Sequence, residues 1–91
     1  MLKLYFNERE GRVGIWDTEA QDWRVEGLHC GECLEVRRGD TWVQTRIEMG
    51  QRMGYVGSVL EGNVDQVDYW YLTDRPDLED DIEGLEVRLA A

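Results

Sequence analysis

In five separate segments of the chain, mainly apolar residues occupy every second position. The positions that share a face within each segment are Leu2, Leu4 and Phe6; Val13 and Ile15; Leu34 and Val36; Val43, Thr45, Ile47 and Met49; and Leu85, Val87 and Leu89. Because successive side chains of a strand point to opposite faces, this spacing is typical of antiparallel strands with one buried face. In a chain of 91 residues, five such segments predict a mainly β fold.

The residues between these segments predict how they are connected. Arg38-Gly39-Asp40 lies between two alternating segments at hairpin spacing. Residues 76–83 begin with the chain's only proline, carry acids in the first turn and place Leu78 and Ile82 four apart before Gly84, which predicts one short helical turn. Such a set fits a small, strongly bent antiparallel sheet or an SH3-like or OB-like barrel, and spacing does not choose between them. The length predicts a single domain over 1–91.

The charge of the chain excludes whole classes of function. Asp and Glu number 20 against 10 Lys and Arg, which gives a formal net charge of −10 and argues against direct nucleic-acid binding. No apolar run approaches the roughly 18 residues of a membrane span, so we expect no membrane attachment. Residues 1–10 have neither a long apolar region nor a small-residue cleavage site. We therefore expect a cytoplasmic protein with reduced thiols.

Cys30 and Cys33, with His29 directly before them, have the spacing of a metal site. Two thiolates two residues apart can bind one Zn²⁺ from a tight turn, but a structural site needs four ligands. His29, carboxylates or the cysteines of a second copy would have to supply the rest, and a symmetric homodimer would give four thiolates. The simpler interpretation is a β-turn with two small, mostly buried thiols. A thioredoxin-like redox role lacks its βαβ context.

An acidic segment near the end of the chain is the candidate partner-binding surface. Its residues are Asp74, Asp77, Glu79, Asp80, Asp81 and Glu83, with Trp70 as an aromatic anchor. In a helical or tightly coiled segment these charges would be spaced at about 3 Å, near the roughly 3.4 Å between phosphates of one DNA strand. An extended segment would space them at about 6 Å. The alternative is an ordinary solvated face that keeps a small protein soluble.

Four blocks of the sequence resemble a known family. They are LHCGECLEV at 28–36, WVQTRIE at 42–48, WYL at 70–72 and GLEVR at 84–88. In this order they are similar to a small domain of unknown function from Firmicutes and their phages, plasmids and integrative elements. This chain has extra residues between the second and third blocks, so we interpret 50–67 as an inserted loop or hairpin. The resemblance implies a phage or mobile-element setting and no reaction.

These observations favour a binding protein over an enzyme. The chain has a single His and lacks the G-x-S-x-G, P-loop and dinucleotide-binding patterns. We expect a non-enzymatic acidic inhibitor that acts in the bacterial host cytosol by occupying a basic surface of a larger protein. Its most concrete form is an anti-CRISPR protein that blocks DNA loading by a type II CRISPR nuclease, whose channels are positively charged. The alternative is a structural or regulatory module of a mobile element, as a zinc-linked homodimer through Cys30 and Cys33.

Overall fold

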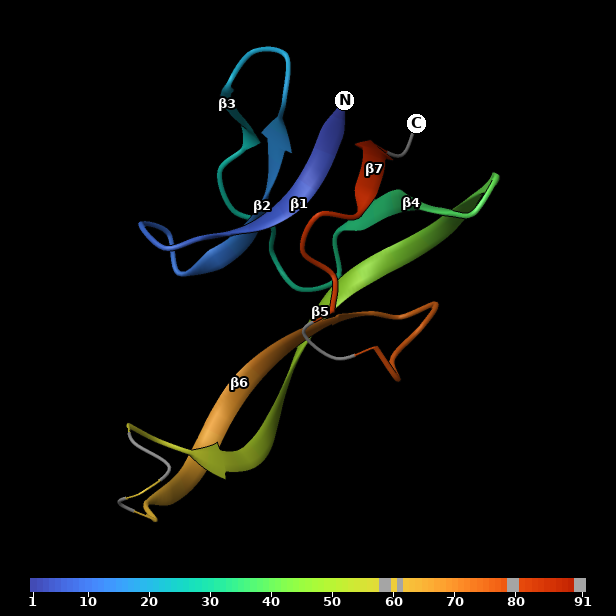
Figure 1. Cartoon of the computed structure of the whole chain (residues 1–91). Coiled ribbons are helices and arrows are strands. Elements are labelled where there is room, and N and C mark those ends of the chain that lie inside the picture. Colours follow the sequence, from blue (N-terminus) through green and yellow to red (C-terminus); the bar gives the residue numbers. More distant parts are fainter. Residues whose placement is uncertain (58–59, 61, 79–80, 90–91) are drawn as a thin grey trace.

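The computed structural model describes residues 1–57, 60, 62–78 and 81–89. These residues form one antiparallel sheet of seven strands, which confirms the predicted mainly β fold (Figure 1). The strands are β1 (Leu2–Asn7), β2 (Arg12–Asp17), β3 (Asp22–Val25), β4 (Cys33–Arg38), β5 (Thr41–Tyr55), β6 (Val64–Leu72) and β7 (Glu86–Leu89). The described part of the chain includes no helix long and apolar enough to cross a bilayer.

The strand order shows that the sheet is open. The order is β3-β2-β1-β7-β4-β5-β6, so the last strand in the chain lies between β1 and β4. Val87 of β7 pairs with Leu2 on one side and with Val36 on the other. The edge strands β3 and β6 do not pair with each other, so the bent-sheet alternative is correct and the barrel alternative is wrong. β3 has only four residues, and much of β6 pairs with the far half of β5, so neither strand closes a barrel.

One apolar cluster holds the body together. Its buried members are Leu4, Val13, Ile15, Leu28, Leu34, Val36, Ile47, Leu72, Ile82 and Val87. They come from β2, near one end of the strand order, and from β6, at the other end, so the sheet must curl around them. The predicted alternation is confirmed wherever a strand crosses this cluster. It fails at Phe6 and Met49, both 40% exposed, and at Leu89, which is 45% exposed, because these positions lie beyond the cluster.

The connections differ in how well the sequence predicted them. The hairpin between β4 and β5 is confirmed: Arg38 pairs with Thr41, and Gly39 has a φ of 63°, which a two-residue hairpin turn requires. The predicted helical turn at 76–83 is wrong in its described part. The N–H of Leu78 donates to the carbonyl of Arg75, which closes a four-residue turn, and none of the described residues between 76 and 83 is helical. Residues 79 and 80 lie outside the described residues.

Residues 50–67, interpreted as an inserted loop or hairpin, belong to a hairpin that projects from the body (Figure 1). Its pairing runs without interruption from Gly50 with Tyr69 to Tyr55 with Val64. We call the described residues of 50–69 the arm. β5 ends at Tyr55, and Gly57 follows it with a φ of 77°.

Candidate protein-binding groove

A groove of about 350 Å³ opens where the arm meets the body. Its described lining is largely apolar, with a carboxylate from each of two separate elements. The lining residues are Phe6, Gly11 and Val13 from the β1–β2 hairpin, Met49 from β5, Asp68 and Trp70 from β6, and Ile82 and Glu83 from the loop before β7. Trp70 packs against the core and Ile82 belongs to it, so the floor of the groove is fixed by the fold.

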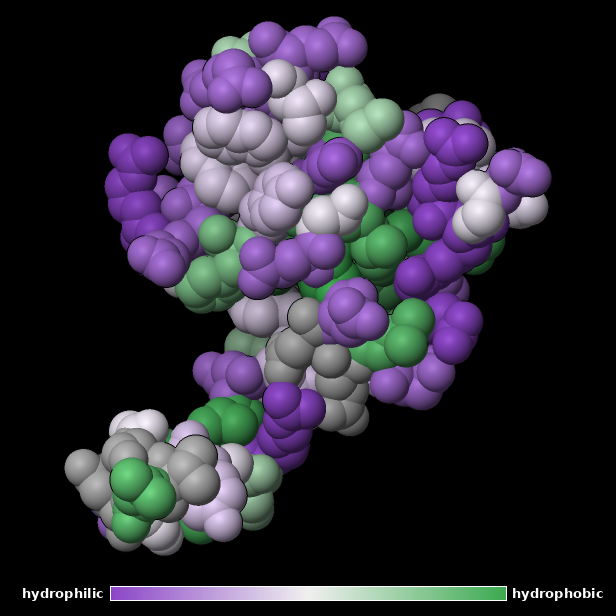
Figure 2. Space-filling view, viewed as in Figure 1, coloured by the Kyte–Doolittle hydropathy of each residue, from purple (hydrophilic) through white to green (hydrophobic). Residues whose placement is uncertain are grey.

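Further exposed apolar residues lie beyond the groove on one face of the arm. Met49 pairs with Trp70, and the pairs Met53–Gln66 and Tyr55–Val64 lie four and six residues further out, on the same face. Met53, Tyr55 and Val64 are 63%, 58% and 52% exposed. Figure 2 shows apolar side chains on the arm and where it joins the body. The hydrogen-bonded pair Gln51–Asp68 lies on this face between Met49 and Met53, so the apolar residues of the arm form a second group beyond the rim of the groove. Singly exposed apolar residues are common, but a group of them beside a groove is typical of a binding surface.

The opposite face of the arm is stabilised by contacts of the Tyr69 ring. The Tyr69 ring covers Gly50, since a Cβ added at position 50 would lie 2.6 Å from that ring. The Tyr69 ring also lies 5.7 Å from the Tyr71 ring, and the Arg52 guanidinium sits 5.1 Å from its centroid. Cross-strand cover of a glycine by an aromatic ring compensates for the missing side chain. These contacts stiffen the near half of the arm and so hold the groove wall in place.

The charged residues in the described lining of the groove are all acidic. Asp68 is exposed and accepts a hydrogen bond of 3.1 Å from Gln51 Nε2, and Glu83 is also exposed. Among the described residues that line the groove, none carries a positive charge. On the sheet face away from the core, by contrast, cations are matched with acids: Arg37 pairs with Glu86 at 3.0 Å and Arg88 with Glu35 at 2.6 Å. The groove therefore favours a ligand that is both apolar and cationic.

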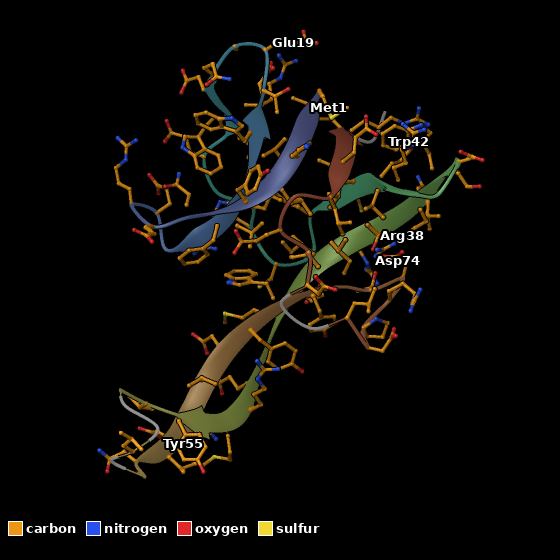
Figure 3. All side chains as sticks on the ribbon, viewed as in Figure 1. Met1, Glu19, Arg38, Trp42, Tyr55 and Asp74 are labelled. Carbon is orange, nitrogen blue, oxygen red and sulfur yellow. The ribbon has the colours of Figure 1, made fainter. Side chains whose placement is uncertain are left out.

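Asp74 is structural and is not available to a partner. Its carboxylate accepts two hydrogen bonds from Arg38, of 3.0 and 3.4 Å, and only 12% of its side chain is exposed (Figure 3). Burial alone raises the pKa of Asp74. The hydrogen bonds from Arg38 and Thr45 and the charge of Arg38 outweigh burial and hold that pKa below its ordinary value. The pair ties the segment after β6 to the β4–β5 hairpin.

We expect Asp74→Asn to weaken the fold and to reduce its acid sensitivity. Because the folded pKa lies below the unfolded value of about 3.9, the carboxylate's contribution is complete above about pH 4 and is lost as the pH falls through the folded pKa. The variant should be about 1–2 kcal/mol less stable at neutral pH and should lose less additional stability on acidification. Urea unfolding over a pH series measures both. Asp81→Asn, at an exposed site, is the control, and equal losses in the two variants would contradict the role of Asp74.

The other residues of the predicted partner-binding set do not share one environment. Asp77 forms a two-bond ion pair with its neighbour Arg75, at 3.1 and 2.9 Å, and this hydrogen bonding lowers the pKa of Asp77. Glu79 and Asp80 lie outside the described residues. Asp81 is exposed but does not line the groove, so the structure brings only Glu83 and Trp70 together there.

Sequence reasoning missed other members of the groove. The alternation pattern predicts Phe6 and Met49 on the buried faces of their strands. Asp68 stood out in no pattern. A usable signal exists for Asp68: it lies between Val67 and Tyr69 in a strand, where an acid is expected to face solvent.

The two cysteines and His29 lie on the turn before β4. Both thiols are free and exposed, so the interpretation as mostly buried thiols is wrong. The core residues Leu28 and Leu34 flank the turn and leave it outside the cluster. Among the described residues, no group of three His, Cys, Asp or Glu side chains is arranged to hold a metal ion, so His29 does not complete a site with the two thiols.

Comparison with known proteins identifies the family. No curated protein and no solved structure matches the chain. Residues 2–89, which include every strand and the whole groove lining, match the family described as a domain of unknown function, DUF5348. The chain therefore belongs to the DUF5348 family.

Proposed function

We propose that this protein is a non-enzymatic binding protein whose groove receives a segment of a larger, basic protein. The observation that carries the proposal is the convergence of five apolar side chains and two exposed carboxylates in one groove, in a chain with a net charge of −10. Apolar contacts with Trp70 and Phe6 would supply most of the affinity. The carboxylates of Asp68 and Glu83 would select cationic side chains and accelerate the encounter.

Two features favour a protein segment over a small molecule. The groove is small and open, and further exposed apolar side chains lie beyond it on the same face of the arm, so a compact ligand in the groove would leave them uncovered. Beside the carboxylates of Asp68 and Glu83, the described lining contains no imidazole, thiol, hydroxyl or amine that could act with them as a nucleophile or proton carrier. Both features support binding without catalysis.

The most specific form of this proposal is inhibition of a type II CRISPR nuclease. Such enzymes hold the guide–target duplex in positively charged channels and read the adjacent motif with arginines. The acidity of the chain and its sequence resemblance to a family of phages and mobile elements support this form. With Asp74 and Asp77 paired internally, the groove is a better contact surface for it than the acidic segment as a whole. Unchanged DNA loading by a guide-loaded nuclease at excess protein would reject this form.

A basic peptide tests the general proposal. The probe is a synthetic hexapeptide in which arginine alternates with leucine, followed by amide chemical shifts during titration. We expect the largest shifts around Phe6, Asp68 and Glu83. The double variant Asp68→Lys/Glu83→Lys should bind about tenfold more weakly, because two attractive pairs of up to about 1 kcal/mol each become repulsive.

The control is a pair with the same change of net charge at a distance. Glu19 and Asp40 are exposed in turns of the body, and Glu19 lies at the end of the molecule away from the arm (Figure 3). Glu19→Lys/Asp40→Lys should bind the peptide nearly as well as the unaltered chain. Equal weakening by both double variants would show that net charge alone attracts the peptide and would overturn the groove. The same peptide with glutamate in place of arginine should not bind.

A further inference from the structure

The turn that carries Cys30 and Cys33 is rigid. The N–H of Glu32 donates to the His29 carbonyl at 3.1 Å, and Gly31 between them has a φ of 87°. Two backbone hydrogen bonds to Ile47 attach the same turn to β5. The Gly31 N–H donates to the Ile47 carbonyl at 2.8 Å, and the Ile47 N–H donates to the Glu32 carbonyl at 3.2 Å. The two exposed thiols are therefore presented by a backbone whose geometry is fixed in advance.

A small hollow opens beside Cys33. Cys33 is the first residue of β4, and its cross-strand neighbour on β5 is Arg46. Cys33 and Arg46 line a shallow hollow of about 240 Å³ together with Gln44, Thr45 and Thr73. The Glu32 carboxylate accepts a hydrogen bond from the His29 backbone N–H, which also holds the turn.

We propose that Cys30 and Cys33 are one half of a zinc site that is completed by the same two cysteines of a second copy. Structural zinc is held by four ligands, and thiolates are among its preferred ones. The described residues of one chain offer these two thiols without a third side chain in reach. Two copies related by a two-fold axis supply four thiolates, which is a complete tetrahedral set. The proposal is independent of the groove.

The chemistry balances without an oxidant or a reductant. One Zn²⁺ replaces the protons of four thiols, so four protons pass to the buffer and four S–Zn bonds form. Each chain carries a net charge of −10, so two copies repel each other. At about 0.15 M salt the screening length is about 8 Å, and this repulsion acts only over short distances. Binding should therefore be measured at that salt concentration or above.

Metal titration combined with measurement of molecular mass tests the proposal. The reduced protein is titrated with Zn²⁺, and with Co²⁺ as a spectroscopic probe of sulfur ligation, while sedimentation reports the mass. We expect one metal ion per two chains, thiolate-to-cobalt charge-transfer bands, and a doubling of mass that a chelator reverses. Cys30→Ser and Cys33→Ser should each abolish both metal binding and dimer formation. Because both thiols are exposed, these variants should keep the circular dichroism of the unaltered chain.

His29→Ala is the matched control, because it removes the imidazole and keeps the backbone that holds the turn. It should bind metal and dimerise as the unaltered chain does. One metal ion per monomer, lost in His29→Ala, would place the site within one chain and overturn the proposal. The absence of sulfur-to-cobalt bands, or a mass that stays monomeric at saturating Zn²⁺, would also overturn it.

Discussion

Replacing Gly14 by alanine should lower the free energy of unfolding by about 2–3 kcal/mol, although the change adds only one methyl group. Gly14 lies in the middle of β2, where its missing side chain lets β3 approach. A Cβ at this position would lie 2.6 Å from the Val25 carbonyl oxygen and 2.8 Å from that of Glu26. Both are backbone atoms that cannot rotate away, and the Glu26 carbonyl also accepts a hydrogen bond of 2.9 Å from the buried Asn7 side chain. Thermal unfolding should show a fall in Tm of roughly 8–24 °C.

Gly27→Ala separates this clash from the general effect of replacing a glycine. Its nearest new neighbour would be the Arg12 side chain at 3.1 Å, which can move. In both variants alanine restricts the unfolded chain and so stabilises the fold by about 0.4–1 kcal/mol. We therefore expect Gly27→Ala to be nearly neutral. If Gly14→Ala were equally neutral, β3 would not lie against β2 in the register that brings Val25 opposite Ile15.

The strands that cross the core could be predicted from the sequence because burial there is one-sided. In β4, Leu34 and Val36 face the apolar cluster while Glu35 and Arg37 form ion pairs on the other face. Alternation records this difference between the faces directly. The position of β7 between β1 and β4 could not be predicted from alternation, because strand order depends on contacts between segments that are distant in the chain.

β3 and β6 were missed for opposite physical reasons. β3 contains four residues, too few for a period to be recognised, and its clearest contact is the edge-to-face pair of Trp23 with Trp16 at 5.1 Å. β6 is long enough, but most of it lies in the arm, where neither face is covered by the core. Apolar residues therefore occur on both faces of the arm, as Val64 and Val67 do, and the alternation disappears.

The acidic segment shows why charge count alone did not locate the site. The sequence between 74 and 86 offered seven acids against the single cation Arg75. In the fold, cations distant in the chain come to meet them, Arg38 at Asp74 and Arg37 at Glu86. Only the three-dimensional arrangement separates acids neutralised in this way from Glu83, which lines the groove.

Ile47→Ala should be the most destabilising truncation on β5. Ile47 is fully buried, pairs with Leu72 and lies where β4, β5 and the Cys30–Cys33 turn meet. Removing its outer carbons leaves a cavity that a seven-stranded sheet cannot collapse to fill, at a cost of about 2–5 kcal/mol. For a domain of this size, whose total stability is about 5–14 kcal/mol, that is a large fraction. Thermal unfolding should show Tm lower by roughly 8–40 °C.

Met49→Ala is the matched control, because Met49 lies two residues further along the same strand and on the same face. Its side chain is 40% exposed in the groove, so its truncation opens no closed cavity and should cost less than about 1 kcal/mol. The same substitution should weaken binding of the arginine–leucine peptide, which Ile47→Ala at a temperature where it remains folded should not do. Equal loss of stability in the two variants would mean that the core continues into the groove, and the groove would then be interior space rather than a binding surface.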